Sequence, residues 1–240
     1  MSEQPDPQTS SPPEPPSLAQ RQRWTGEIMA VLGVYAIPAI MRSLLSFAVS
    51  THSREGKFFL TEASGFVHSS SVIAFGLFML WRSGETAAAF GLVRPRLWKD
   101  LGIAAAAYLG RYITSYAYAY AFYFVAPELY PRRSMYDFGH PTTQADYVAT
   151  FLHALCNGTA EELMLWGLLY TRLNLLTDAR FAPAIGIAAL FASYHLYQGP
   201  YAVGSVFLTG LLHAALFLKF RRLAPLMLAH VLWDMVLLWR

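Results

Sequence analysis

Residues 147–172 read YVATFLHALCNGTAEELMLWGLLYTR, a mostly apolar stretch with two adjacent acidic residues near its middle. An α-helix rises about 1.5 Å per residue, so about 20 such residues cross a hydrocarbon core of about 30 Å. An ionisable group deep in that core costs at least ~2.5 kcal/mol, so Glu161 and Glu162 need partners, water or a function. The sequence therefore predicts a spanning helix that borders a polar cavity.

The composition of the whole chain agrees with a membrane protein. Of the 240 residues, 55% are hydrophobic and 14% are charged, against about 25% charged residues in an average soluble protein. The net charge of +3 does not indicate a nucleic-acid-binding protein, because most of the 18 lysines and arginines lie in loops beside apolar runs. Cys156 is the single cysteine, which excludes an intramolecular disulfide and makes redox chemistry unexpected.

Apolar runs of spanning length recur along the chain and predict an all-α, polytopic transmembrane helix bundle of about seven spans, or eight. The predicted spans are residues 25–50, 58–81, 101–126, 147–172, 181–197, 201–219 and 223–239. Only residues 197–200 join the fifth and sixth spans, and Gly199-Pro200 stops a helix there, so these spans should form a tight antiparallel hairpin.

The N-terminal residues 1–22 differ from the rest of the chain. They are rich in Pro, Ser and Gln and show no apolar period, which predicts a disordered tail. They also lack the basic start, apolar stretch and cleavage site of a signal peptide, so the first spanning helix is expected to direct insertion. Residues 23–240 are predicted to form a single integral membrane domain.

Basic residues are distributed unequally between the two sides of the predicted bundle. If the N-terminus is cytoplasmic, the inner segments hold Arg21, Arg23, Arg82, Arg94, Arg96, Lys99, Arg172, Arg180, Lys219, Arg221 and Arg222. The outer segments then hold Arg54, Lys57, Arg132, Arg133 and Arg240. Because cytoplasmic loops carry an excess of Lys and Arg, this asymmetry predicts that residues 127–146 and the C-terminus lie outside.

Polar side chains of three predicted spans lie at similar depth. Counting from inner span ends at 172, 180 and 222 places Glu161 at ~16 Å, His195 at ~22 Å, His230 at ~12 Å and Asp234 at ~18 Å. His230 and Asp234 are spaced i, i+4 and therefore share a helix face, as do Phe191 and His195. We expect these groups to line one cavity near the bilayer midplane.

The same residues carry a resemblance to a known family. The chain has Glu161-Glu162, FxxxH at 191–195 and HxxxD at 230–234, on separate predicted spans. In order and placement they are similar to the motifs EExxxR, FxxxH and HxxxN or HxxxD of the CAAX-processing and bacteriocin-processing (CPBP) membrane proteins, also called Abi proteins. This family includes the type II CAAX prenyl proteases. The segment FGLVRPRLWKDLG at 90–102 resembles the amphipathic stretch that often precedes the family's core, so the resemblance covers residues 90–240.

The resemblance implies a metal-independent glutamic intramembrane endopeptidase that hydrolyses a peptide bond of a membrane-associated protein or peptide. Glu161, beside Glu162, would be the general base that activates a water, and His195 would help to hold that water. His230 would donate to the oxyanion of the tetrahedral intermediate, alongside Asp234. An ionised Asp cannot donate a hydrogen bond as Asn does, so Asp234 is expected to orient His230 or to be protonated.

Further residues are candidates for contact with the substrate. Asn157 lies one turn before Glu161 and is expected to bond its carboxyl. Phe191 shares a face with His195, and Tyr112 and Tyr116 belong to a stripe of tyrosines at every fourth position. This stripe either packs between helices or lines the substrate cavity. Three lone histidines are expected to be packed or hydrogen-bonded rather than catalytic, namely His68, His153 and His213.

The first motif departs from the family at its last position, where Trp166 replaces the Arg. That Arg would lie on the same helix face as Glu162 and hold its carboxylate, which an indole cannot do. We expect Arg111 or Arg42 to supply the missing cation. The alternative is a weakly active or inactive family member that acts as a membrane immunity or partner-binding protein.

Two other classes stay open at this point. Glu and His residues are zinc ligands, although no HExxH motif is present, and a small transporter would fit the spans but not the lack of a repeat. The expected partners are a membrane-associated substrate, prenylated or not, and the lipid of a bacterial cytoplasmic membrane, without nucleic acid. No cofactor and no metal are expected.

Overall fold

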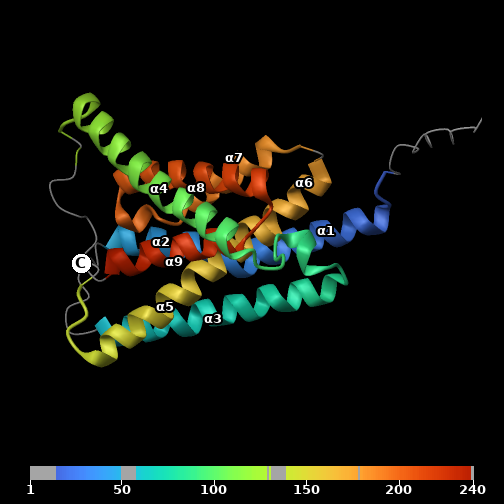
Figure 1. The fold of residues 1–240 in the computed structure, drawn as a ribbon, viewed down its shortest axis with the longest axis horizontal. Coiled ribbons are helices and arrows are strands. Elements are labelled where there is room, and N and C mark those ends of the chain that lie inside the picture. The colour runs from blue at the N-terminus through green and yellow to red at the C-terminus, as the bar shows by residue number, and fades with distance from the viewer. Residues whose placement is uncertain (1–14, 50–57, 129, 131–138, 178, 239–240) are drawn as a thin grey trace, which may run out of the picture.

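The computed structural model describes residues 15–49, 58–128, 130, 139–177 and 179–238, with the side chains of 45–49 and 238 left out. All regular elements in these ranges are helical, which confirms the predicted all-α class (Figure 1). The elements are α1 (Leu18–Val31), η1 (Leu32–Ala36), α2 (Ile37–Val49), α3 (Phe58–Ser83), η2 (Ala87–Phe90), α4 (Leu97–Val125), α5 (Gln144–Glu162), η3 (Leu163–Tyr170), α6 (Thr171–Thr177), α7 (Phe181–Ser193), η4 (Leu196–Gln198), α8 (Pro200–Phe220) and α9 (Ala224–Leu238).

Three helical stretches in the described ranges are long and apolar enough to cross a membrane, namely Leu18–Leu44, Phe58–Ser83 and Pro200–Phe220. Two shorter apolar helices, Phe181–Ser193 and Ala224–Leu237, accompany them. Because η1 joins α1 to α2 and η3 joins α5 to α6 without a break, each predicted span has one continuous helical segment as its counterpart.

Two boundaries differ from the sequence prediction. Helix α1 starts at Leu18, inside the predicted tail, because Ser17 and Gln20 cap it reciprocally with hydrogen bonds of 2.8 and 3.2 Å. The first 14 residues of that tail lie outside the described residues. Helix α7 ends at Ser193, so His195 lies just beyond a helix end rather than within a span, and η4 leads from there to Gly199 with φ at 97°.

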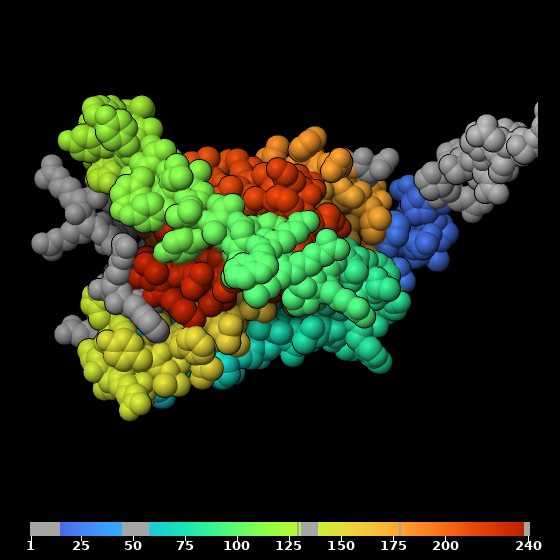
Figure 2. Space-filling view, viewed as in Figure 1, coloured from blue at the N-terminus to red at the C-terminus, as the bar shows by residue number. Residues whose placement is uncertain are grey.

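The helices pack as an interlocked bundle. Helix α5 packs against α3 on one side and α9 on the other, and α7 pairs with α8 as the predicted hairpin. Helix α4 crosses both α8 and α9 and covers them on the face seen in Figure 2. Helix α1 contacts α6 and η3. Helices distant in the sequence thus surround α5 and α9.

The stretch η3 forms the centre of the core and follows directly on the two adjacent glutamates. All of its residues are buried and its backbone is a π-helix, a rare form that recurs at functional sites. The ring of Trp166 packs 6.3 Å from that of Tyr170 and 6.5 Å from that of Phe217. This packing connects η3, which follows α5, with α8.

Candidate active site

A cavity of about 670 Å³ lies inside the bundle, between α2, α3, α4, α5, α8 and α9. The structure brings four of the predicted catalytic residues to its wall, namely Glu161, His195, His230 and Asp234. The predicted layer of polar groups on separate helices therefore exists as one cavity wall. Asn157, Arg42 and Arg111 also line it.

The fifth predicted residue, Glu162, lies behind the wall with 2% of its surface exposed. Its Oε1 atom lies 2.8 Å from Nδ1 of His230 and 2.8 Å from Nδ1 of His213. An ionised carboxylate can only accept, so each Nδ1–H donates to it. Glu162 thus links α5 to α8 and α9 and fixes the plane of both imidazole rings.

The outer nitrogen of His230 faces the two remaining carboxylates. Its Nε2 lies 3.5 Å from Oε2 of Glu161 and 3.7 Å from Oδ1 of Asp234. The Oε2 atom of Glu161 is buried and makes no hydrogen bond among the described residues. Glu161 thus lines the cavity and has one carboxylate oxygen next to an imidazole that could share its proton.

Asn157 does not bond Glu161 as predicted. Its amide Nδ2 donates to Oδ2 of Asp234 at 3.1 Å, because α5 and α9 pack closely enough for the two side chains to meet. The predicted link between Asp234 and His230 is present at the longer distance given above. Asp234 therefore stands between an amide donor and an imidazole.

His195 approaches the cavity from the end of α7. Its Nδ1 lies 2.8 Å from the carbonyl oxygen of Phe191, and the Phe191 ring lies 4.8 Å from the His195 ring and 5.9 Å from that of His230. Phe191 is buried and is not part of the cavity wall, so it holds the two imidazoles rather than facing the cavity. The four-residue spacing of the FxxxH motif thus places the backbone carbonyl and the ring of Phe191 against His195.

The prediction that Arg111 or Arg42 replaces the motif arginine beside Glu162 is wrong. Histidines, and neither Arg111 nor Arg42, contact Glu162. The guanidinium of Arg111 instead stacks over the ring of Trp233 at 4.3 Å. His213, expected to be packed or hydrogen-bonded, is the second partner of Glu162. The motif pattern could not reveal this partner, because His213 lies on a helix without a motif.

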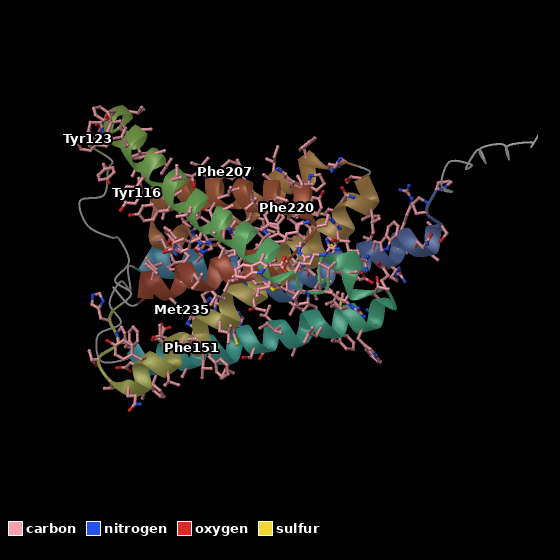
Figure 3. The ribbon with its side chains drawn as sticks, viewed as in Figure 1. Tyr116, Tyr123, Phe151, Phe207, Phe220 and Met235 are labelled. Atoms are coloured by element: carbon pink, nitrogen blue, oxygen red, sulfur yellow. The ribbon has the colours of Figure 1, made fainter. Side chains whose placement is uncertain are left out.

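The two predicted residues of the tyrosine stripe, Tyr112 and Tyr116, do not line the cavity. Tyr112 and Tyr116 are 39% and 58% exposed, their hydroxyls are 3.2 Å apart, and Tyr116 stands on α4 in Figure 3. Arg111 and Ser115 of the same helix line the cavity instead. The part of α4 that carries Tyr112 and Tyr116 therefore directs these side chains away from the polar interior.

Glu162, His213 and His230 offer three ligand atoms within 4.8 Å of one another, a set that could hold a metal ion. Around tetrahedral zinc, with bonds of about 2.0–2.1 Å, neighbouring nitrogen or oxygen ligands are about 3.3 Å apart. The two distances of 2.8 Å to Oε1 of Glu162 are instead those of hydrogen bonds. The geometry of the three residues fits a hydrogen-bonded set better than a zinc site.

The comparison with known families covers this same region. Residues 143–236, from the cap of α5 to near the end of α9, match the family model "Type II CAAX prenyl endopeptidase Rce1-like". This part of the chain is thus similar to the type II CAAX prenyl endopeptidases. The match includes all three motif positions and supports an integral membrane protein, in agreement with the apolar helices. No curated protein and no solved structure matches the chain.

This match confirms the resemblance drawn from the sequence, and the matched family consists of endopeptidases. The match does not assign roles to individual residues. Glu161, Glu162, His195, His230 and Asp234 remain predicted catalytic residues, and the geometry described above is the basis on which we assign them roles.

Proposed function

We propose that the protein is a glutamic endopeptidase that cuts a membrane-associated peptide or protein within the bilayer of a bacterial cytoplasmic membrane. The observation that carries this proposal is that Glu161 lines the cavity while its buried Oε2 makes no hydrogen bond among the described residues and lies 3.5 Å from Nε2 of His230. A carboxylate without a fixed donor can accept a proton from water. A neighbouring imidazole can then stabilise the charge that develops.

In this mechanism Glu161 removes a proton from a water, whose oxygen adds to the scissile carbonyl carbon while the carbonyl electrons move to its oxygen. His230 donates its Nε2–H to that oxyanion, since its Nδ1–H is already committed to Glu162. His195 holds the water through Nε2, since its Nδ1–H is committed to Phe191. Protonated Glu161 then passes the proton to the leaving nitrogen as the C–N bond breaks.

A second candidate is a catalytically lapsed member that binds a membrane partner. One observation favours it, namely Trp166 at the position of the motif Arg. The bond from Asn157 to Asp234 argues against it, because this bond holds Asp234, whose Oδ1 lies 3.7 Å from Nε2 of His230. The two candidates differ in whether any peptide bond is cut.

The test compares new peptide termini, by mass spectrometry, in cells that express the wild type or Glu161→Gln. Glutamine keeps the size of the side chain but cannot act as a base, and a matching amount of folded protein in detergent shows that insertion is intact. Termini found with the wild type alone support the proteolytic proposal. Identical termini in both cells favour the binding protein, and cleavage that a chelator abolishes and zinc restores would favour the metal enzyme.

A further inference from the structure

Most of the described basic residues lie at the end of the bundle opposite the cavity, and the exceptions, Arg42 and Arg111, line the cavity. Eleven of the described lysines and arginines lie at the start of α1, the α3–α4 connection, α6, the start of α7 and the α8–α9 turn. Arg222 of that turn pairs with Asp100 at the start of α4, and Arg172 of α6 pairs with Glu27 of α1. In Figure 1 the start of α1 and α6 mark this end, at the right of the view.

The cavity occupies the other half of the same helices. Its wall uses Leu60–Ser69 at the start of α3, Tyr201–Thr209 at the start of α8 and His230–Leu237 at the end of α9. Glu161 lies at its deep end, and polar side chains such as Ser64, His68 and Ser205 continue outward from there. Polar side chains therefore extend from Glu161 towards this end of the bundle.

From these two observations we infer that the substrate reaches the site from the extracytoplasmic side. Lysine and arginine accumulate on the cytoplasmic side of membrane proteins, so the basic end is cytoplasmic and the cavity belongs to the outer half of the bilayer. The inference rests on the proposed function. It makes the substrate a membrane-anchored or exported peptide whose cleaved segment lies at or beyond the outer leaflet, rather than the tail of a cytosolic protein.

The test measures access without turnover. In a Cys156→Ser background, single cysteines replace Ser205 in the cavity wall and, as a matched control, the exposed Thr177 at the basic end. A membrane-impermeant maleimide added to intact cells should label the Ser205→Cys protein, and label Thr177→Cys only after the cells are opened. The reverse pattern, or no labelling of Ser205→Cys from outside, would overturn the inference while leaving the cleavage assay of Glu161→Gln unaffected.

A second inference concerns His213, and it rests on the contacts of Glu162. The carboxylate of Glu162 is buried, and its family partner is missing because Trp166 packs into the core. A buried charge without a partner is strongly destabilising. His213, 1% exposed on α8, donates to Oε1 of Glu162 at 2.8 Å and lies with its ring 6.0 Å from that of His230.

We propose that His213 is a positioning residue that takes the place of the motif arginine. It holds Glu162 from the side of α8, so that Glu162 in turn holds Nδ1 of His230 and directs Nε2 of His230 towards Glu161. A residue of this kind acts through Glu162 and touches no substrate. An arginine restored at position 166 should therefore make His213 dispensable.

The test uses four variants, His213→Gln, His213→Met, Trp166→Arg and the double variant Trp166→Arg/His213→Met. The probe is a farnesylated peptide with a C-terminal CAAX sequence, together with any peptide found by terminus mapping. His213→Met should lower kcat at least tenfold with little change in KM, His213→Gln should lose less because its amide still donates, and the double variant should recover. Thermal unfolding in detergent should follow the same order, because the recovery comes from a restored partner for Glu162.

Three results would overturn the assignment to His213. Full activity of His213→Met would mean that Glu162 needs no second partner. A double variant as inactive as His213→Met, while Trp166→Arg alone matches the wild type, would mean that His213 does something an arginine cannot. Activity in Trp166→Arg with none in the wild type would mean that His213 never replaced the arginine.

Discussion

The carbonyl oxygen of Phe191 lies 2.8 Å from Nδ1 of His195, and this contact fixes the chemical state of the imidazole. A carbonyl oxygen can only accept, so Nδ1 carries a proton and, in the neutral imidazole, the lone pair is on Nε2. The neighbouring rings of Tyr194 and Tyr197, with centroids 4.8 and 6.1 Å from that of His195, hold it in place. His195 is thus suited to accept a hydrogen bond from water and not to bind a second donor.

This geometry predicts a specific result for substitutions of His195. Replacement by Ala should reduce kcat by about 10²-fold, the usual loss for a group that helps to hold or activate the nucleophile. Replacement by Gln, which can place an oxygen near the position of Nε2, should lose less than Ala. Steady-state kinetics of the two variants measure the difference. Equal activity of wild type, Ala and Gln would remove His195 from the mechanism.

Phe191 is predicted to act on the site through packing. Removing its ring by Phe191→Ala should cost about 3–5 kcal/mol of unfolding free energy and release both imidazoles, while Phe191→Leu fills much of the space and should cost less. Thermal unfolding in detergent and kcat, measured together, check this. A Phe191→Ala protein with wild-type stability and activity would show that the ring contacts with His195 and His230 have no role.

Arg172 is predicted to be a main stabilising residue at the basic end of the bundle. Its guanidinium is 1% exposed, pairs with Glu27 and lies 3.0 Å from Glu85. Removing one partner of a buried ion pair costs about 3–5 kcal/mol, so Arg172→Met should lower the unfolding temperature strongly. The matched control is Arg21→Met, on the exposed start of the same α1–α6 region. Equal unfolding temperatures of the two variants would contradict this role.

The pair of Asp100 and Arg222, outside the spans, predicts a dependence of stability on pH. Hydrogen bonds from the Arg222 guanidinium, and from the backbone N–H of Arg96 at 2.7 Å, hold the pKa of the Asp100 carboxyl below its usual value. A carboxyl whose pKa is lower in the folded state stabilises the protein above its unfolded pKa of about 3.9 and loses that effect as pH falls through the folded pKa. The unfolding-temperature difference between wild type and Asp100→Asn should therefore be constant near neutral pH and shrink below pH ~4. A difference that stays the same at pH 3 would show that the charge of Asp100 has no part in it.

Much of the architecture follows from the sequence because spanning helices need long apolar runs and little else. Those runs located all the described helical segments except the short η2, and the motif spacing located the cavity groups on α5, just after α7 and on α9. His213 could not be found in this way, because its partner Glu162 is brought to it only by packing. The sequence could not predict the direction of Tyr112 and Tyr116 either. Lipid and neighbouring helices are both apolar, so the same residue pattern suits a helix face directed towards either of them.

The last prediction concerns Gly158, which allows α5 and α9 to approach each other at the level of the site. A Cβ atom at this position would lie 2.9 Å from the backbone nitrogen of Val231 and 3.2 Å from Cβ of His230. Backbone cannot move aside as a flexible side chain can, so Gly158→Ala should push α9 outward at a cost of about 1–3 kcal/mol. Because His230 moves with α9, its contacts with Glu161 and Glu162 should lengthen and kcat should fall more than stability alone would explain. The control is Gly102→Ala on α4, where a Cβ meets nothing within 4 Å and the helix should gain up to about 1 kcal/mol. Unfolding temperature and kcat of both variants measure the effect, and a fully active Gly158→Ala enzyme would show that the close approach of α5 and α9 is not what sets the position of His230.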